Sequence, residues 1–257
     1  MTEAEWIAFL QRPEIPAFNR AMLVNPDDDL PRLVFADWMD ENCPDEFFNR
    51  FIRESITSQE SIPFRVGYGN QRRRLSFDRG RVFASLYSRS PPPKRREPRT
   101  LFAAVWRAQW VNRLALDGVG PKCLKSFFHD PPMAMVRGVY FHENDCSPAL
   151  LPEILNSSHL THLTYLSLSG RASTELLRAL LSCEVVVQFT GIELTVADNV
   201  STAGLIANSP KLTGLSHMRL HGCRSADFAA ALANSPYLCE AIRAQWRRAT
   251  DEGGANR

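Results

Sequence analysis

Apolar residues in the second half of the chain recur as a triplet with the spacing LxxLxL. In an extended strand, this spacing places the last two apolar side chains of each triplet on the same side. The triplet occurs five times, at Val111/Leu114/Leu116, Val136/Val139/Phe141, Leu163/Leu166/Leu168, Phe189/Ile192/Leu194 and Leu215/Met218/Leu220. Successive triplets begin 25, 27, 26 and 26 positions apart. We therefore predict a strand that recurs about every 26 positions.

A second apolar pattern lies between the strands and has the spacing of a helix. Side chains at i, i+1, i+4 and i+5 share one helical face. The pattern occupies positions 150/151/154/155, 176/177/180/181, 202/203/206/207 and 228/229/232/233, so it recurs at the same interval as the strands. Each unit therefore reads as strand, turn, helix, turn.

One such unit cannot bury its apolar side alone, but stacked units form a continuous core. We predict an α/β fold, in which residues 101–238 form a short leucine-rich-repeat solenoid of about five units with parallel strands. The alternative is a chance pattern in an ordinary α/β domain. At the end of the chain, Leu238, Ile242 and Trp246 share one helical face, so residues 239–257 are expected to form a capping helix and a frayed tail.

Residues 1–56 are predicted to form a small α-helical module. Residues 3–10 have an apolar helical face that ends before Pro13. Asp28 or Asp29 can cap the next helix, which carries Pro31 in its first turn. A third helix is expected over residues 46–56.

Part of this module resembles a known family. The residues that carry the likeness are Asp27-Asp28-Asp29, the run from Pro31 to Glu41, and Phe51-Ile52-Arg53. They resemble the repeat-companion domain, a short module at the N-termini of bacterial leucine-rich-repeat proteins. The resemblance implies a helical companion to the repeats and implies no reaction. The segment 47–50 departs from it, since the family usually has a shorter and more polar link there.

Charge is unevenly distributed along the chain. Residues 1–64 carry 5 basic and 13 acidic side chains, residues 65–113 carry 13 and 2, and residues 114–257 carry 12 and 13. The chain has no run of 18 apolar residues and does not begin like a signal peptide, so we expect a cytoplasmic protein without a membrane span. Its six cysteines form no CxxC pair and are expected to be reduced.

Residues 57–100 combine arginines with three consecutive prolines, and we interpret them as a basic loop or linker. Residues 75–87 could form a short helix, and residues 100–110 are expected to be helical. The alternative function of this segment is nucleic-acid binding, because arginines are interleaved with aromatic residues. The candidate contacts are Arg72, Arg73, Arg74, Arg79, Arg81, Lys94, Arg95 and Arg96, within a basic region that spans residues 65–113.

The sequence contains none of the common catalytic or phosphate-binding motifs. The adjacent carboxylates of residues 27–29 lack the alternating spacing of a calcium loop, and helix capping explains them better. A zinc site from His217, His221 and Cys223 would lack a fourth ligand. We therefore predict no enzyme activity, no metal and no cofactor.

Side chains between the strand leucines should line the concave surface of a solenoid. The candidates for protein binding are Arg113, Arg137, Tyr140, His142, Tyr165, Ser167, Glu193, His217, Arg219 and His221. Tyrosine and arginine are enriched at protein interfaces. The main hypothesis is therefore an interaction module or adaptor that binds a protein partner through this face, although any solenoid must expose some residues there.

Overall fold

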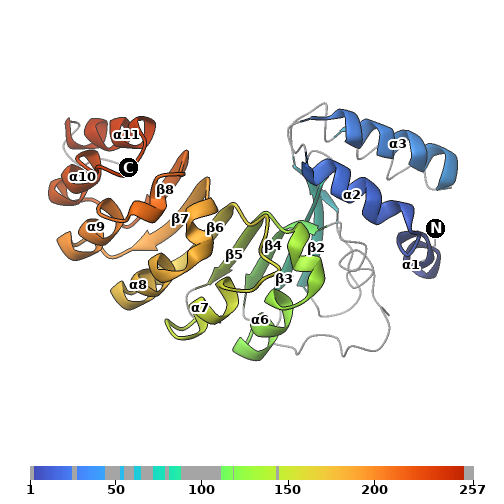
Figure 1. Cartoon of the computed structure of the whole chain (residues 1–257), viewed down its shortest axis with the longest axis horizontal. Coiled ribbons are helices and arrows are strands. Elements are labelled where there is room, and N and C mark those ends of the chain that lie inside the picture. The colour runs from blue at the N-terminus through green and yellow to red at the C-terminus, as the bar shows by residue number, and fades with distance from the viewer. Residues whose placement is uncertain are drawn as a thin grey trace. The chain divides into compact units, whose positions relative to one another are not determined.

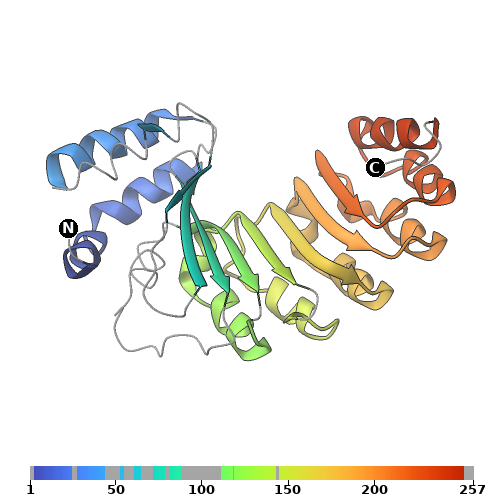
Figure 2. The same cartoon turned by 180° about the vertical axis from the view of Figure 1, so that it is seen from behind.

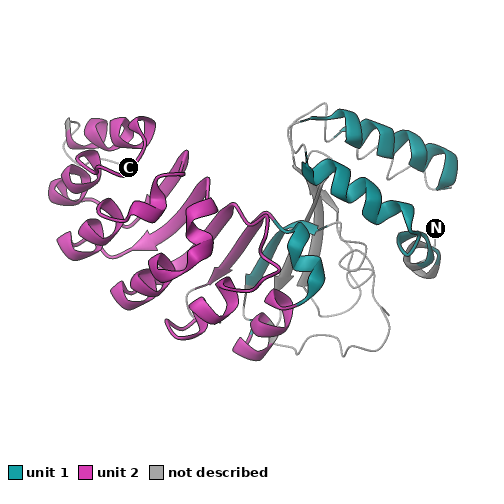
Figure 3. Cartoon of the chain, in the orientation of Figure 1, with its two compact units in different colours: residues 1–119, 130–136 teal, residues 120–129, 137–257 magenta. Residues whose placement is uncertain are grey.

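The computed structural model describes residues 3–24, 28–43, 53–54, 61–64, 72–78, 81–87, 111–117, 119–142 and 145–251. The chain divides into two compact units (Figure 3). Unit 1 comprises residues 1–119 and 130–136, and unit 2 comprises residues 120–129 and 137–257. The described chain is mixed α/β, with parallel strands and helices (Figure 1). Within its described part, no helix is both long enough and apolar enough to cross a membrane.

Unit 1 begins with three helices, whose bounds are α1 Glu3–Leu10, α2 Glu14–Val24 and α3 Leu30–Asn42. Phe9, Phe18, Phe35 and Trp38 bring their rings together, with centroids 5.1 to 6.1 Å apart. This aromatic cluster joins the three helices into one small core. The helix expected over residues 46–56 lies outside the described residues except for positions 53 and 54.

Asp29 is the N-cap residue of α3, although its side chain accepts no capping hydrogen bond from the helix backbone. The Asp28 carboxylate accepts the Leu30 N–H at 2.9 Å, and the Asp29 carboxylate accepts from Arg32 at 2.5 Å. Arg32 is fully buried, and its guanidinium also donates to the Asp28 carbonyl. Arg53 pairs with Asp37 at 2.6 Å. Asp28 therefore binds the first N–H of α3, whereas Asp29 and Asp37 form ion pairs with arginines of unit 1.

Unit 1 also contains four strands, β1 Ser61–Phe64, β2 Arg72–Asp78, β3 Arg81–Tyr87 and β4 Val111–Asp117, and a short 3-10 helix, η1 Pro131–Met135. β1 and β3 both pair with β2 in antiparallel fashion, and β3 pairs with β4 in parallel. The sequence predicts a loop over residues 57–100 with a short helix over residues 75–87. Both predictions are wrong at the residues that form β1, β2 and β3. The physical reason is local: Leu75 and Phe77 alternate with polar residues, and residues 82–87 are rich in branched and aromatic side chains, which strands favour. The helix expected over residues 100–110 lies outside the described residues.

Unit 2 contains four parallel strands in sequence order: β5 Gly138–His142, β6 Tyr165–Ala172, β7 Gly191–Val196 and β8 His217–His221. Gly138 pairs with Tyr165, Tyr165 with Gly191, and Gly191 with His217. Paired residues are therefore 27, 26 and 26 positions apart. Parallel pairing in this order requires a crossover segment between each strand and the next.

The helices α7 Leu150–Leu155, α8 Thr174–Ser182 and α9 Val200–Ala207 supply these crossovers, and they lie on one side of the strands (Figures 1 and 2). The helix α6 Pro121–Phe128 precedes β5, and the helices α10 Ala226–Ala233 and α11 Glu240–Asp251 follow β8. Two short 3-10 helices, η3 Glu184–Gln188 and η4 Pro210–Leu212, precede β7 and β8. The apolar positions predicted to face inward are buried, except that Leu181 and Leu220 are only partly buried. The amphipathic C-terminal helix is confirmed, because Ile242 and Trp246 of α11 are buried and Trp246 contacts Phe228.

Polar side chains bind backbone groups at both ends of these helices. At their N-termini, side chains of Ser147, Ser173, Asn199 and Ser225 accept backbone N–H groups, which are otherwise left without partners in a helix. Beyond their C-termini, Ser157 donates to the Phe128 carbonyl and Ser235 donates to the Ala207 carbonyl. The second set links two turns of unit 2 to the helix of the preceding segment.

Candidate functional site

The strands of unit 2 present a polar face opposite their buried leucines. Strand pairing sets Tyr140, Ser167, Glu193 and Arg219 side by side in one row. Gly138, Tyr165, Gly191 and His217 form a second row, and Thr195 and His221 are paired in a third. Since side chains alternate along a strand, the three rows lie on the same face. We call this surface the strand face.

Glu193 is the centre of a hydrogen-bonded cluster on the strand face. Its Oε2 accepts the Tyr165 hydroxyl at 2.9 Å, and its Oε1 lies 2.9 Å from Nε2 of His221. The Arg219 guanidinium lies 3.9 Å from the same Oε1. Tyr165 and His221 each reach Glu193 diagonally from a neighbouring strand, as long side chains on paired strands can. The carboxylate on β7 therefore has partners from both neighbouring strands, β6 and β8.

The surroundings of Glu193 lower the pKa of its carboxyl group. Burial, the largest single influence, acts to raise the pKa because it penalises the charged form. The hydrogen bonds from His221 and Tyr165 and the charge of Arg219 act in the opposite direction and together outweigh it. Glu193 is therefore a carboxylate near neutral pH, and it contacts Tyr165, Arg219 and His221 in this form.

Tyr165 also contacts a second aromatic ring. Its centroid lies 5.3 Å from that of Tyr140, with an angle of 37° between the ring planes. The ring occupies space that a side chain at Gly191 would need, since a Cβ there would be 2.5 Å from Cδ2 of Tyr165. The glycine on β7 thus allows the Tyr165 hydroxyl to reach Glu193.

The cluster brings together five of the residues predicted from the sequence: Tyr140, Tyr165, Glu193, Arg219 and His221. Arg219 and His221 remain well exposed, at 60% and 51% of their side-chain surface. His217 is exposed one row away, and Ser167 is buried between its paired neighbours at 9% exposure. Arg137 and His142 are half-buried in unit 2. Arg113 is exposed on β4, which belongs to unit 1.

The arginines of the nucleic-acid alternative are only partly described. Arg72, Arg73 and Arg74 belong to β2, and Arg81 begins β3. Arg79, Lys94, Arg95 and Arg96 lie outside the described residues. The structure therefore describes no assembled nucleic-acid surface from this set.

Three cysteines of unit 2 have thiols whose pKa is raised by burial. Burial raises the pKa of Cys146 to about 12, that of Cys183 to about 11 and that of Cys223 to about 12. A nucleophilic cysteine needs a lowered pKa, because the thiolate is the reactive form. Among the residues that the structure describes, no group of three or more His, Cys, Asp or Glu side chains is placed to hold a metal ion.

Sequence reasoning identified the residues of the strand face but not the bonds between them. The Tyr165–Glu193 and Glu193–His221 pairs are each 28 positions apart, two more than directly paired residues. Diagonal neighbours on adjacent strands have this offset, so the repeat length indicates which residues could meet but not which of them form hydrogen bonds.

Comparisons with protein-family models, curated proteins and solved structures find no match to this chain. The resemblance of residues 20–56 to the repeat-companion domain therefore stays a prediction from the sequence.

Proposed function

We propose that unit 2 is a short leucine-rich-repeat solenoid and that this protein is a non-enzymatic interaction module. Three regularities support the solenoid: strand partners 26 or 27 positions apart, helix-capping residues every 26 positions, and buried apolar triplets at the same interval. In repeat architectures each unit contacts mainly its neighbours, which leaves one long strand surface for binding.

The strand face is the proposed binding surface for a protein partner. The observation that carries this proposal is the cluster of Tyr140, Tyr165, Glu193, Arg219 and His221. Tyrosine and arginine are frequent anchors of protein interfaces. Side chains already held by hydrogen bonds and ring contacts lose less conformational freedom on binding, which favours affinity.

The catalytic alternative has less support. The raised pKa values of Cys146, Cys183 and Cys223 disfavour a cysteine nucleophile. The carboxylate of Glu193 already accepts hydrogen bonds from Tyr165 and His221 and pairs with Arg219, which leaves it poorly placed to accept a substrate proton.

A pull-down from nuclease-treated native lysate, read by quantitative mass spectrometry, tests the proposal. Wild type is compared with a Tyr140→Ala/Tyr165→Ala/Arg219→Ala variant. The matched control is Glu175→Ala/Arg178→Ala, which removes two exposed side chains of α8. Circular dichroism establishes that each variant is folded.

We expect a protein partner that is retained by wild type and by the α8 control and is lost from the triple variant. A partner retained equally by the triple variant would contradict the strand-face proposal. Recovery that depends on intact nucleic acid and tolerates the triple variant would instead assign the function to the arginine-rich segment of residues 65–113.

A further inference from the structure

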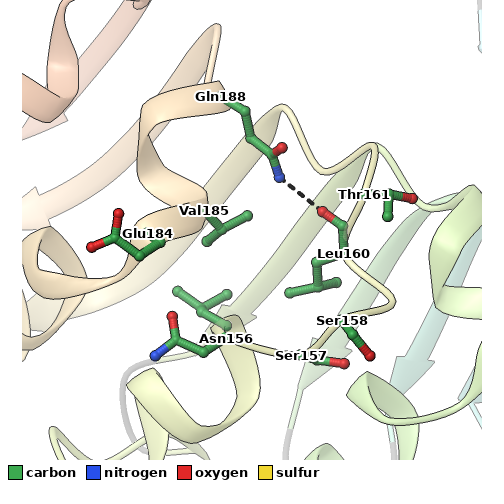
Figure 4. Close-up of a pocket in the computed structure, with 9 residues that line it drawn as sticks. Asn156, Ser157, Ser158, Leu160, Thr161, Glu184, Val185 and Gln188 are labelled. Carbon is green, nitrogen blue, oxygen red and sulfur yellow. Dashed lines mark hydrogen bonds between the residues drawn. The ribbon is translucent and has the colours of Figure 1, made fainter.

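A shallow pocket of about 440 Å³ lies in unit 2, away from the strand face and beside the turn that follows α7 (Figure 4). Its lining residues are Leu155, Asn156, Ser157, Ser158, Leu160, Thr161, Glu184, Val185 and Gln188. The Gln188 amide donates to the Leu160 carbonyl at 2.8 Å along one side. The pocket thus combines apolar side chains with the polar end of a helix.

The corresponding place one interval later in the sequence is occupied by the side chain of Lys211. Its Nζ donates to the carbonyl oxygens of Ser182 at 2.8 Å and Cys183 at 3.1 Å. The third acceptor is Oε1 of Glu184, at 3.0 Å. Carbonyl groups at a helix C-terminus attract cations, because they have no partners within the helix and carry partial negative charge.

The two places correspond residue by residue. Asn156, Ser157 and Ser158 precede Ser182, Cys183 and Glu184 by 26 positions, and Val185 precedes Lys211 by the same interval. The backbone matches as well: the Ser157 carbonyl accepts the Leu160 N–H at 3.1 Å, as the Cys183 carbonyl accepts the Val186 N–H at 3.4 Å. The later site holds a lysine, whereas the pocket has a valine in its place.

We propose that this pocket binds the side chain of a lysine supplied by another polypeptide. The ammonium group would donate to the Asn156 and Ser157 carbonyls and to the Ser158 hydroxyl, as Lys211 does to its three acceptors. The lysine methylenes would lie against Val185 and Leu160, since lysine stems pack on apolar surface. A compact ammonium with three donors suits three converging acceptors better than a planar guanidinium does.

A polypeptide lysine is favoured over a free amine for two reasons. The occupant of the corresponding site is itself a lysine side chain within a folded chain. In addition, the neutral Ser158 hydroxyl takes the place in the pocket that the Glu184 carboxylate has beside Lys211. The ammonium contact alone is therefore weak, and neighbouring peptide groups are needed to support binding. The proposal does not depend on the strand face, because the two surfaces share no residue.

Nuclear magnetic resonance of the ¹⁵N-labelled full chain can test this inference. The probe is the peptide acetyl-Gly-Lys-Gly-amide, with the same peptide carrying Nε-acetyl-lysine as the neutral control and butylammonium as the free amine. We expect saturable shifts of the Ser158, Thr161 and Gln188 amides with the lysine peptide. The acetylated peptide should cause none, and butylammonium should bind more weakly.

Two variants make the test specific. Val185→Lys places an internal lysine where Lys211 lies one interval later, and it should abolish the shifts. Val185→Met fills the same space without charge and should also abolish the shifts. It replaces Val185→Lys in the test if the lysine variant does not fold. Conversely, Lys211→Val should create a second set of shifts around Ser182 and Cys183.

Some outcomes would overturn the inference. Shifts that persist in a folded Val185→Lys or Val185→Met variant would place the peptide elsewhere. Equal shifts with the acetylated peptide would exclude ammonium recognition, and equal affinity for butylammonium would assign the pocket to free amines. The strand-face triple variant should bind the peptide normally, so the failure of either proposal leaves the other intact.

Discussion

Gly191 offers a quantitative test of how the strand face is organised. A Cβ at this position would lie 2.5 Å from Cδ2 and 3.0 Å from Cε2 of Tyr165, well inside ordinary contact distance. The Gly191→Ala substitution therefore forces the Tyr165 ring to move. That movement breaks the 2.9 Å hydrogen bond to Glu193 and disturbs the contact with Tyr140.

The magnitude follows from three contributions to the free energy of unfolding. Overpacking costs about 1–3 kcal/mol. A weakened hydrogen bond to a charged, partly exposed acceptor adds about 1 kcal/mol. Alanine is favoured over glycine in a strand by about 0.5–1 kcal/mol, which offsets part of the loss. We expect Gly191→Ala to destabilise unit 2 by about 2 kcal/mol, within the range of a single core overpacking.

Urea denaturation followed by circular dichroism measures this change. The matched control is Gly204→Ala in α9, where the nearest heavy atom to an added Cβ is 4.0 Å away. We expect the control to stabilise the protein by about 0.5–1 kcal/mol, the usual gain of alanine over glycine in a helix. The expected changes in unfolding free energy have opposite signs for Gly191→Ala and Gly204→Ala. This difference separates the steric contact with Tyr165 from the general effect of replacing glycine by alanine.

The decisive step is a double-mutant cycle with Tyr165→Ala. Without the ring, the added methyl group has no Tyr165 atoms to displace, so Gly191→Ala should become neutral or slightly stabilising. Residues in direct contact show coupling of this kind, whereas independent sites do not. If Gly191→Ala costs the same free energy with and without Tyr165, the steric role assigned to this glycine is refuted.

Two further predictions concern single side chains. The pKa of Glu193 in the folded protein lies below its ordinary value of 4.5. The extra stability of wild type over Glu193→Gln should therefore be fully present above pH 4.5 and should disappear as the pH falls through the folded pKa. If urea titrations show the same stability difference between the two proteins down to about pH 3, this prediction is contradicted. Ser235 is buried, donates to the Ala207 carbonyl and accepts the Tyr237 and Leu238 N–H groups, so Ser235→Ala should cost about 1–3 kcal/mol of unfolding free energy. The exposed Ser182→Ala should change it by less than about 0.5 kcal/mol, and similar effects of the two substitutions would argue against the buried bonds.

Much of unit 2 could be predicted from the sequence because its apolar periodicity is short-range and repeated. The triplets and helical pairs indicate which side chains face inward, and burial of Leu166, Ile192 and Ile206 follows directly. The strands of unit 1 were harder to predict for a physical reason. Residues 72–87 contain five arginines beside short apolar stretches, and this arginine-rich composition favoured a loop over strands.

The candidate site shows a different limit. That Tyr165 and Glu193 share a face follows from the repeat alone. Their hydrogen bond depends on a diagonal approach between strands and on the absence of a side chain at Gly191. Such details depend on the relative positions of whole strands, and local patterns in the sequence do not encode them.

The turns of unit 2 share a feature with a mechanical consequence. Side chains of Ser157, Gln188, Lys211 and Ser235 each donate to a backbone carbonyl 28 or 29 residues earlier, at Phe128, Leu160, Ser182 and Ala207. Each such bond crosses from one strand–helix segment to the one before it. A chain pulled from its C-terminus would therefore lose these bonds one at a time, beginning at Ser235. Its resistance to force would rise and fall once for every segment released.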